Sequence, residues 1–263
     1  MTRLPTKTMS RMFDERLEVN EATAGTLLYS EHVVRYQLAA SYAAGKTVLD
    51  AACGSGYGAY LLATSGAKKV WAVDADQRAL EQAAKRYSHE TIEFLTDNVQ
   101  SLAKIGEAEV DLAVSLETIE HLADSDSFLQ QVKRVLKPGG LAIISTPNRE
   151  VFGQTNPYHL KEFTRQEFMA ALSQYFTNVV ILEQYNVLAS VIDSGAAKTA
   201  AAATTADKAL YFIALASDAE IIKPAQNFIS LNEPALQRWQ NNVAWRLANG
   251  LYGILTKLGV MRR

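Results

Sequence analysis

From residue 46 onward, short runs of β-branched and other apolar residues alternate with segments of helical periodicity, and this alternation limits the fold more than any other feature of the chain. Five compact apolar runs are predicted to be buried strands: 47–51, 69–74, 91–95, 110–115 and 140–146. Three segments between them have helical spacing: 57–64, 77–87 and 126–136. Strand, helix and strand repeated in this way predict a parallel sheet with right-handed crossovers.

Two more strands are expected at 178–184 and 209–216, so the predicted fold is a doubly wound α/β fold with a seven-stranded, mostly parallel sheet. With 263 residues and 48% hydrophobic content, the chain is long enough to bury the core of such a sheet. The predicted organisation has three parts: an N-terminal helical lid at 1–44, the sheet domain at 45–217 and a C-terminal helical appendage at 218–263.

Composition narrows the classes of partner and compartment. The net charge of −2 provides no overall attraction to nucleic acid, although a local basic patch stays open. Cys53 is the only cysteine, which excludes a disulfide framework and suits a reducing compartment. The N-terminus is too polar for a signal peptide, and no stretch reaches the roughly 18 uncharged apolar residues of a membrane span. We therefore expect a soluble, cytoplasmic protein.

A glycine-rich loop, Cys53-Gly-Ser-Gly-Tyr-Gly58, follows the first predicted strand and opens the first helix of the sheet domain. Glycines let the backbone approach a ligand closely, and the helix N-terminus offers N–H groups to an anion. The spacing G-x-G-x-G is tighter than the G-x-G-x-x-G of dinucleotide sites, so it suits a smaller anion such as an amino-acid carboxylate. Asp74 ends the second strand, where its carboxylate can accept hydrogen bonds from a ribose.

These features, together with Thr96-Asp97-Asn98, the segment 110–122 and the Leu-Lys-Pro-Gly-Gly turn at 136–140, resemble the cofactor motifs of class I methyltransferases that use S-adenosylmethionine (SAM). The resemblance covers about residues 45–217 and implies that SAM is the cofactor.

The same resemblance implies a role for individual residues. Gly54 and Gly56 are expected at the methionine end of SAM, Asp74 at the ribose hydroxyls and Asp97 at the adenine amino group. The other members of the implied cofactor-binding set are Asp50, Ala52, Cys53, Ala75, Asn98 and Leu116. Ala52 departs from the family, which usually has its first glycine at this position.

A second cluster, Glu117-Thr-Ile-Glu120-His121, lies just past the carboxyl end of the fourth predicted strand, where open α/β sheets place their active sites. Residues at i, i+3 and i+4 share one face of a helical turn, so the three side chains are expected to converge. Two carboxylates on one face repel each other unless a positive group lies between them, and a divalent cation would satisfy both. The alternative explanation of the cluster needs no metal. Acidic residues near the start of a helix are favoured by the helix dipole, and the histidine would only hydrogen-bond a neighbour.

The Glu-x-x-Glu-His string resembles two groups of metal-dependent methyltransferases, the ubiquinone-biosynthesis O-methyltransferases and the enzymes that methylate the terminal 2′-hydroxyl of small RNAs. The RNA group has a further histidine before a Glu-aromatic-Thr-Arg run, which matches His159 and the segment 162–165. The resemblance therefore implies a metal set of Glu117, Glu120, His121 and His159, with Mg²⁺ or Mn²⁺ as the ion. His121, His159 and Glu117 are the candidate catalytic residues, because a histidine without a metal could accept the proton of the acceptor hydroxyl.

The segment Tyr29-Ser-Glu-His-Val-Val-Arg-Tyr36 resembles a bacterial group encoded with surface-polysaccharide assembly enzymes. This favours O-methylation of a sugar or polysaccharide hydroxyl. Three alternatives stay open: a catechol or quinone precursor, an RNA 2′-hydroxyl, and a non-catalytic SAM-binding partner protein. The net charge makes the nucleic-acid reading the weakest of them.

The C-terminal segment combines an apolar stripe with basic charge. Apolar residues recur at helical spacing between 236 and 258, and from residue 221 onward the chain has six basic residues and one acidic residue, Glu233. We expect a helix that packs on the domain or on a second subunit in a homodimer. The alternative is peripheral contact with a membrane that carries lipid-linked glycans.

Overall fold

A computed structural model of the chain describes residues 27–153, 156–186 and 208–224. Its centre is a seven-stranded sheet in the order β3-β2-β1-β4-β5-β7-β6. The strands are β1 (Thr47–Ala51), β2 (Lys69–Asp74), β3 (Ile92–Thr96), β4 (Val110–Leu116), β5 (Leu136–Pro147), β6 (Asn178–Gln184) and β7 (Tyr211–Ser217). The pairs from β3 through β5 are parallel, whereas β7 runs antiparallel to both β5 and β6. The predicted doubly wound, mostly parallel α/β fold is confirmed.

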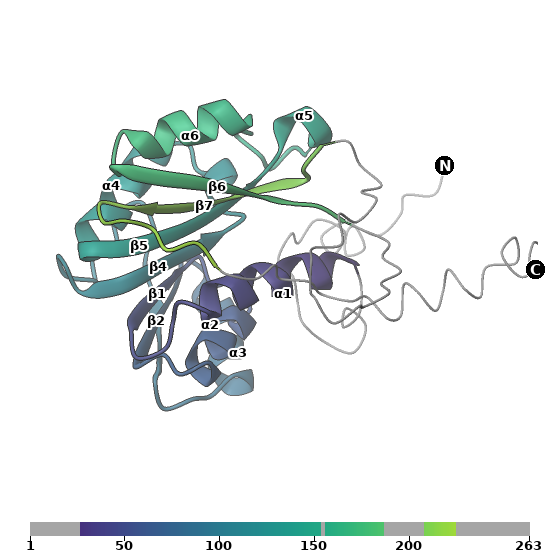
Figure 1. The fold of residues 1–263 in the computed structure, drawn as a ribbon. Helices are drawn as coiled ribbons and strands as arrows, with labels where there is room; N and C mark the ends of the chain where they lie inside the picture. Colours follow the sequence, from purple (N-terminus) through teal and green to yellow (C-terminus); the bar gives the residue numbers. More distant parts are fainter. Residues whose placement is uncertain (1–26, 154–155, 187–207, 225–263) are drawn as a thin grey trace, which may run out of the picture.

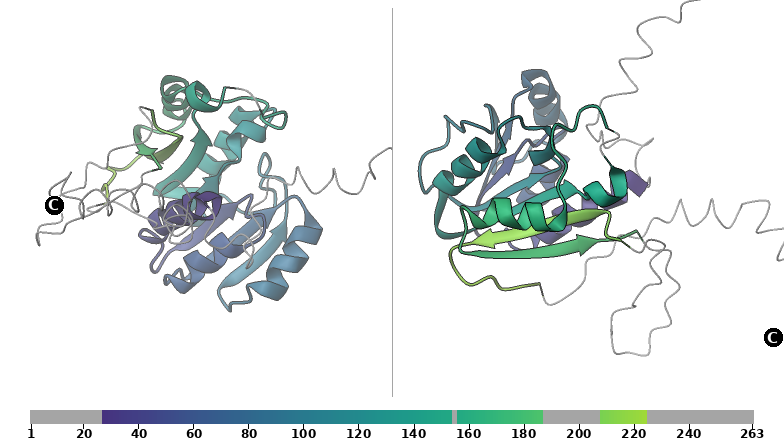
Figure 2. Two further views of the ribbon diagram at one scale, coloured as in Figure 1. Left: turned by 90° about the vertical axis from the view of Figure 1, so that its right-hand side faces the viewer. Right: turned by 90° about the horizontal axis from the view of Figure 1, so that it is seen from above.

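Helices cover both faces of the sheet (Figure 1). One face carries α1 (Leu27–Ala40), α2 (Tyr57–Thr64) and α3 (Gln77–Arg86), and the other carries α4 (Ser125–Val135) and α6 (Arg165–Ser173). Figure 2 shows α6 lying along the β6–β7 edge of the sheet. Two shorter elements follow the carboxyl ends of β4 and β5: the 3₁₀ helix η1 (Ile119–His121) and α5 (Arg149–Phe152).

Each face of the sheet buries its own apolar core. Phe128, Leu129 and Phe168 from α4 and α6 fill one side. Leu62 from α2 and Tyr36 from α1 pack on the other. A sheet buried on both faces explains why its central strands are apolar runs without polar alternation.

The strand β5 begins earlier than the sequence pattern indicates. Pro138 and Gly139 were expected to lie in a turn before the strand predicted at 140–146, but they lie inside β5, which starts at Leu136. Leu136 pairs with Val110, and the register then shifts before Leu141 pairs with Leu112. Gly139, with φ of 75°, lies inside this irregular stretch. The irregular pairing accommodates Pro138, which a regular β-ladder would exclude because proline has no N–H to donate.

The terminal parts of the predicted organisation are described only in part. Of the expected lid at 1–44, the structure describes α1 and the turn after it, while 1–26 lie outside the described residues. Most of the appendage, 225–263, also lies outside them, and with it the expected subunit and membrane contacts. The three-part division therefore stays a prediction. In the part of the chain that is described, no helix has the length and apolarity to cross a bilayer.

Candidate active site

A cavity of about 770 Å³ opens at the carboxyl ends of the parallel strands. Its walls come from the loop after β1, the ends of β2 and β4, the 156–162 segment, α1 and the start of β7. This is the edge at which open α/β sheets bind their ligands, and the volume is typical of a small-molecule site.

The glycine loop bends sharply above β1. Ala52, Gly54 and Gly56 all have positive φ, at 62°, 54° and 82°. A side chain on Gly56 would lie 2.7 Å from Cβ of Ala83, so this glycine is required by packing. A side chain on Gly54 would meet no atom of the described chain within 4 Å, and Gly54 lines the cavity. The space over Gly54 is therefore open to a ligand, and the role of Gly54 at the methionine end of SAM stays a prediction.

Asp74 joins this loop to β2. Its carboxylate is buried and accepts hydrogen bonds of 2.9 Å from the backbone N–H groups of Gly54 and Asp76. Asp74 also lines the cavity.

Only half of the residues that the resemblance implies for cofactor binding line the cavity. Five members line the cavity: Ala52, Cys53, Gly54, Asp74 and Leu116. Five do not: Asp50, Gly56, Ala75, Asp97 and Asn98. The carboxylate of Asp97 accepts hydrogen bonds of 2.8 Å from the N–H groups of Asn98 and Lys104, which shape the turn after β3. The adenine contact implied for Asp97 stays a prediction.

Asp50 lies beneath the glycine loop and is fully buried. Its Oδ1 accepts a 3.1 Å hydrogen bond from the Tyr36 hydroxyl, and its Oδ2 has no partner among the described residues. Burial raises the pKa of Asp50 to about 7, against the lowering effect of the Tyr36 hydrogen bond. The Tyr36 ring also occupies the space where a side chain at Gly58 would stand, 2.0 Å from such an atom, so α1 packs directly on the loop.

Arg35 of α1 is buried behind the cavity wall, where it packs on Tyr211, a residue that lines the cavity. Its side chain is 1% exposed, donates a 3.0 Å hydrogen bond from Nη1 to Oε1 of Gln184, and stacks 4.4 Å above the Tyr211 ring. Its Nε and Nη2 have no hydrogen-bond partner in the described part of the chain. A buried guanidinium in this state suits an anionic ligand group, because leaving it unpaired is costly. The available signal was an arginine among the apolar residues of α1.

Glu117 begins the second cluster with a strained backbone, at φ of 53°. Its N–H donates to Oγ of Ser145 at 3.1 Å, and that hydroxyl donates to Oε1 of Glu117 at 3.2 Å. Burial raises the pKa of Glu117, while Arg35 acts in the opposite direction.

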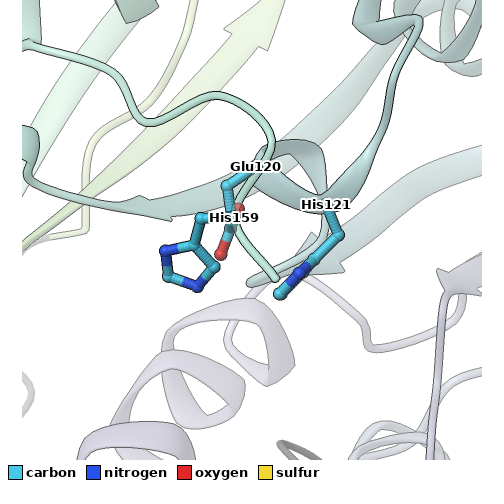
Figure 3. Close-up of side chains that lie close together, drawn as sticks. All are labelled: Glu120, His121 and His159. Carbon is cyan, nitrogen blue, oxygen red and sulfur yellow. The ribbon is translucent and has the colours of Figure 1, made fainter. Parts of the chain in front are cut away.

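Glu120, His121 and His159 place one ligand-type atom each within 4.8 Å of one another. Figure 3 shows the Glu120 carboxylate in the space between the two imidazole rings, whose centroids are 4.9 Å apart. Three of the four implied metal ligands thus converge, whereas Glu117 lies outside this group. The reason is local: η1 is a 3₁₀ turn after a positive-φ residue, so the expected α-helical convergence of Glu117 does not form.

Glu120 is fully buried in this cluster. Its Oε2 accepts a 3.3 Å hydrogen bond from Thr146, and its Oε1 has no partner among the residues that the structure describes. Burial raises the pKa of Glu120 well above its ordinary value, and the carboxylate of Glu117 adds to the effect. An orphaned buried carboxylate oxygen beside two histidines is a donor set that fits a divalent cation.

The backbone of Glu120 positions the third member of the cluster. Its carbonyl oxygen accepts hydrogen bonds from the N–H groups of Leu160 at 2.8 Å and Lys161 at 3.1 Å. Farther along, the buried Phe163 pairs with Asn148 beyond the end of β5. These contacts hold His159 over η1 although the two segments are far apart in sequence.

Comparison with known proteins agrees with this architecture. Residues 49–144 match a family model described as a methyltransferase domain. A protein of Mycolicibacterium smegmatis named as a probable S-adenosylmethionine-dependent methyltransferase is 36% identical over 149 residues, 55% of this chain and 56% of the relative. A ubiquinone biosynthesis O-methyltransferase of Chelativorans is 35% identical over 120 residues, 45% of this chain and 47% of the relative. The chain thus spans about half the length of these curated relatives.

Solved structures share the fold at low identity. An S-adenosylmethionine-dependent methyltransferase from Mesorhizobium loti superposes with a TM-score of 0.53 at 16% identity, covering 70% of this chain and 96% of that one. A 1,6-didemethyltoxoflavin-N1-methyltransferase from Burkholderia thailandensis gives a TM-score of 0.51 at 20% identity, covering 72% of this chain and 79% of that one. The sheet and its flanking helices are therefore those of the class I methyltransferase fold.

Proposed function

We propose that this chain, whose residues 49–144 match the methyltransferase domain family, is an enzyme that transfers the methyl group of SAM to a hydroxyl of its acceptor, with help from a divalent cation. The observation that carries the proposal is the convergence of Glu120, His121 and His159 at the cavity, where Oε1 of the buried Glu120 has no hydrogen-bond partner among the described residues. A methyltransferase acting on an already basic nitrogen would need no such group.

The cofactor half of the cavity supports SAM as the donor. The open space over Gly54 suits the methionine end, and the Asp74 carboxylate suits the ribose hydroxyls. Arg35 supplies a buried positive charge with two unpartnered nitrogens, which suits the methionine carboxylate. We propose these three residues as the core of the cofactor site.

The Glu120–His121–His159 cluster is proposed as the hydroxyl-activating half. Mg²⁺ or Mn²⁺ held there would lower the pKa of a bound hydroxyl. The hydroxyl oxygen attacks the methyl carbon while the carbon–sulfur bond breaks, and the sulfur keeps the electron pair of that bond. The hydroxyl proton passes to a histidine Nε2 or to water, so S-adenosylhomocysteine, the methyl ether and one proton are the products.

The acceptor is proposed to be a ring that carries adjacent hydroxyls. Phe152, Tyr158 and Tyr211 line the cavity, and the rings of Phe152 and Tyr211 lie 5.4 Å apart. A sugar of a surface glycan is our first candidate, following the resemblance of the 29–36 segment. A catechol is the second, because relatives named ubiquinone biosynthesis O-methyltransferases match this chain.

The test is release of S-adenosylhomocysteine from SAM with two acceptors, a vicinal-diol sugar and a catechol, each beside its monomethylated derivative. We expect turnover with a diol that EDTA abolishes and Mg²⁺ or Mn²⁺ restores, and SAM affinity that EDTA leaves unchanged. Full activity in EDTA would remove the cation from the proposal. SAM binding without turnover on either acceptor would contradict O-methylation of these diols and favour a non-catalytic SAM-binding protein.

A further inference from the structure

Three polar groups of the segment 156–162 lie beside the imidazole rings of His121 and His159. The Asn156 amide, the Tyr158 carbonyl and the Glu162 carboxylate each lie within 3.1 Å of an imidazole nitrogen. Carbonyl and carboxylate oxygens only accept, so each of them determines which ring nitrogen carries a hydrogen.

The Asn156 amide is oriented by the backbone. The N–H of Tyr158 donates a 3.0 Å hydrogen bond to Oδ1 of Asn156, so the amide nitrogen Nδ2 is the atom that faces His159. Nδ2 stands 3.0 Å from Nε2 of His159. Because an amide nitrogen can only donate, Nε2 of His159 accepts this hydrogen bond and carries a lone pair.

Glu162 completes the argument from the other side of the ring. Its Oε1 lies 2.7 Å from Nδ1 of His159, and the glutamate side chain is fully buried. Nδ1 therefore donates to the carboxylate, and His159 is the neutral Nδ1–H tautomer. The Tyr158 carbonyl, 3.1 Å from Nδ1 of His121, requires a hydrogen on that nitrogen as well.

We propose that Glu162 is a positioning residue that holds His159 in the Nδ1–H tautomer, so that its Nε2 lone pair is presented to a cation or to the proton of an acceptor hydroxyl. Asn156 donates to this lone pair in the ligand-free protein and gives way to the incoming group. The proposal rests on the proposed function for its catalytic meaning, but the tautomer itself is a property of the protein alone.

The experiment measures the tautomers directly by long-range ¹H–¹⁵N correlation spectroscopy at neutral pH without metal or acceptor. The chain has only four histidines, and His159→Gln identifies the signals of His159. We expect the wild type to show protonated Nδ1 and unprotonated Nε2. Glu162→Leu should shift His159 toward the Nε2–H form, which a free histidine side chain prefers in water, whereas Glu162→Gln retains an oxygen acceptor and should keep most of the Nδ1–H form.

Kinetics then tests the positioning role. Glu162→Leu should lower kcat by about 10- to 100-fold, with the KM for SAM unchanged, and Glu162→Gln should recover part of the loss. Glu150→Gln is the matched control, since Glu150 is exposed and pairs with Lys208. Wild-type His159 in the Nε2–H or doubly protonated form would overturn the proposal, as would an unchanged tautomer in Glu162→Leu. If the tautomer is as stated and no acceptor is methylated, the proposed function fails while this assignment stands.

Discussion

The backbone N–H of Gly54 donates a 2.9 Å hydrogen bond to Oδ2 of Asp74, which connects the glycine loop to the end of β2. A second bond strengthens the connection, because the N–H of Cys53 donates to the carbonyl of Val73 at 2.9 Å. The two halves of the proposed cofactor site are therefore held to each other before any ligand arrives, and binding need not pay to order them.

Asp74→Ala should weaken SAM binding through both of its roles. The variant loses a charge-assisted partner for the ribose and the acceptor that orients the loop, which we expect to cost on the order of 2 kcal/mol. Titration calorimetry measures the change. Asp111→Asn is the control, because Asp111 pairs with Lys137 and Thr47 away from the cavity. Unchanged affinity in Asp74→Ala would exclude Asp74 from the SAM site.

Gly54→Ala and Gly56→Ala form a matched pair with opposite expected outcomes. At Gly56 the new methyl would collide with Ala83 at 2.7 Å, so we expect a loss of folding stability of about 1–3 kcal/mol. At Gly54 it would meet no described atom within 4 Å, so stability should fall by only about 1 kcal/mol from the positive φ, while SAM affinity falls sharply. Urea denaturation and calorimetry separate the two effects. Equal SAM affinity in Gly54→Ala and wild type would show that the space over Gly54 is not used.

Arg35→Gln should weaken binding of SAM but not of methylthioadenosine, which lacks the amino-acid group. The reason is the pair of unpartnered nitrogens on the buried Arg35 guanidinium, which we assign to the methionine carboxylate. Both ligands are titrated into both proteins, so methylthioadenosine reports whether the variant has kept its fold. An equal loss of affinity for the two ligands would assign Arg35 a structural role. Unchanged affinity for both would show that Arg35 does not bind the methionine carboxylate and would favour a contact with the acceptor.

Asp50 should make the ligand-free protein less stable as the pH rises. Its folded-state pKa of about 7 lies above the ordinary value of 3.8, so the folded state holds a proton that the unfolded state releases between these two values. Stability contributed by this proton is therefore present at low pH and lost as the pH rises toward 7. Asp50→Asn cannot titrate, so its stability relative to wild type should increase from pH 5 to pH 8, by on the order of 2 kcal/mol.

Urea denaturation measures the free energy of unfolding of both proteins at pH 5 and pH 8. The contributions of the other titrating groups cancel when the wild-type value is subtracted from that of Asp50→Asn at each pH. The Asn side chain keeps an oxygen that can accept from Tyr36, so the fold should tolerate it. A constant difference between the two proteins would mean that Asp50 is ionised in the folded state at pH 5.

Local patterns predicted most of the sheet, because strand identity here depends on short apolar runs. The expected bounds of β1, β2 and β6 coincide with the observed ones. The helix α6 was not predicted, although the pattern Thr164-x-x-Glu167 in the sequence is typical of the capping box that begins it. The position of Pro138 inside β5 could not be predicted, since it depends on an irregular register with β4.

The candidate site was less predictable than the sheet, because it depends on contacts between residues far apart in sequence and on local backbone conformation. Helical spacing brought Glu120 and His121 together correctly but not Glu117, whose positive φ no spacing rule reveals. Arg35 hydrogen-bonds Gln184, which lies 149 residues later in the sequence. Hydrophobic periodicity describes only neighbouring residues, so it could not predict this contact. The tautomer of His159 depends on an amide orientation and a buried carboxylate, and only coordinates can supply both.

The reversed direction of β7 brings its first residue to the edge of the sheet at which the cavity opens. Because β7 is antiparallel, it begins where the parallel strands end, and Tyr211 at its start pairs with Pro147 at the end of β5. Of the two ends of the connection from β6 to β7, Tyr211 lines the cavity, whereas Gln184 accepts a hydrogen bond from Arg35 of the proposed donor site. We therefore expect substitutions at Gln184 and Tyr211 to change donor affinity through Arg35, and those at Tyr211 to change acceptor choice as well.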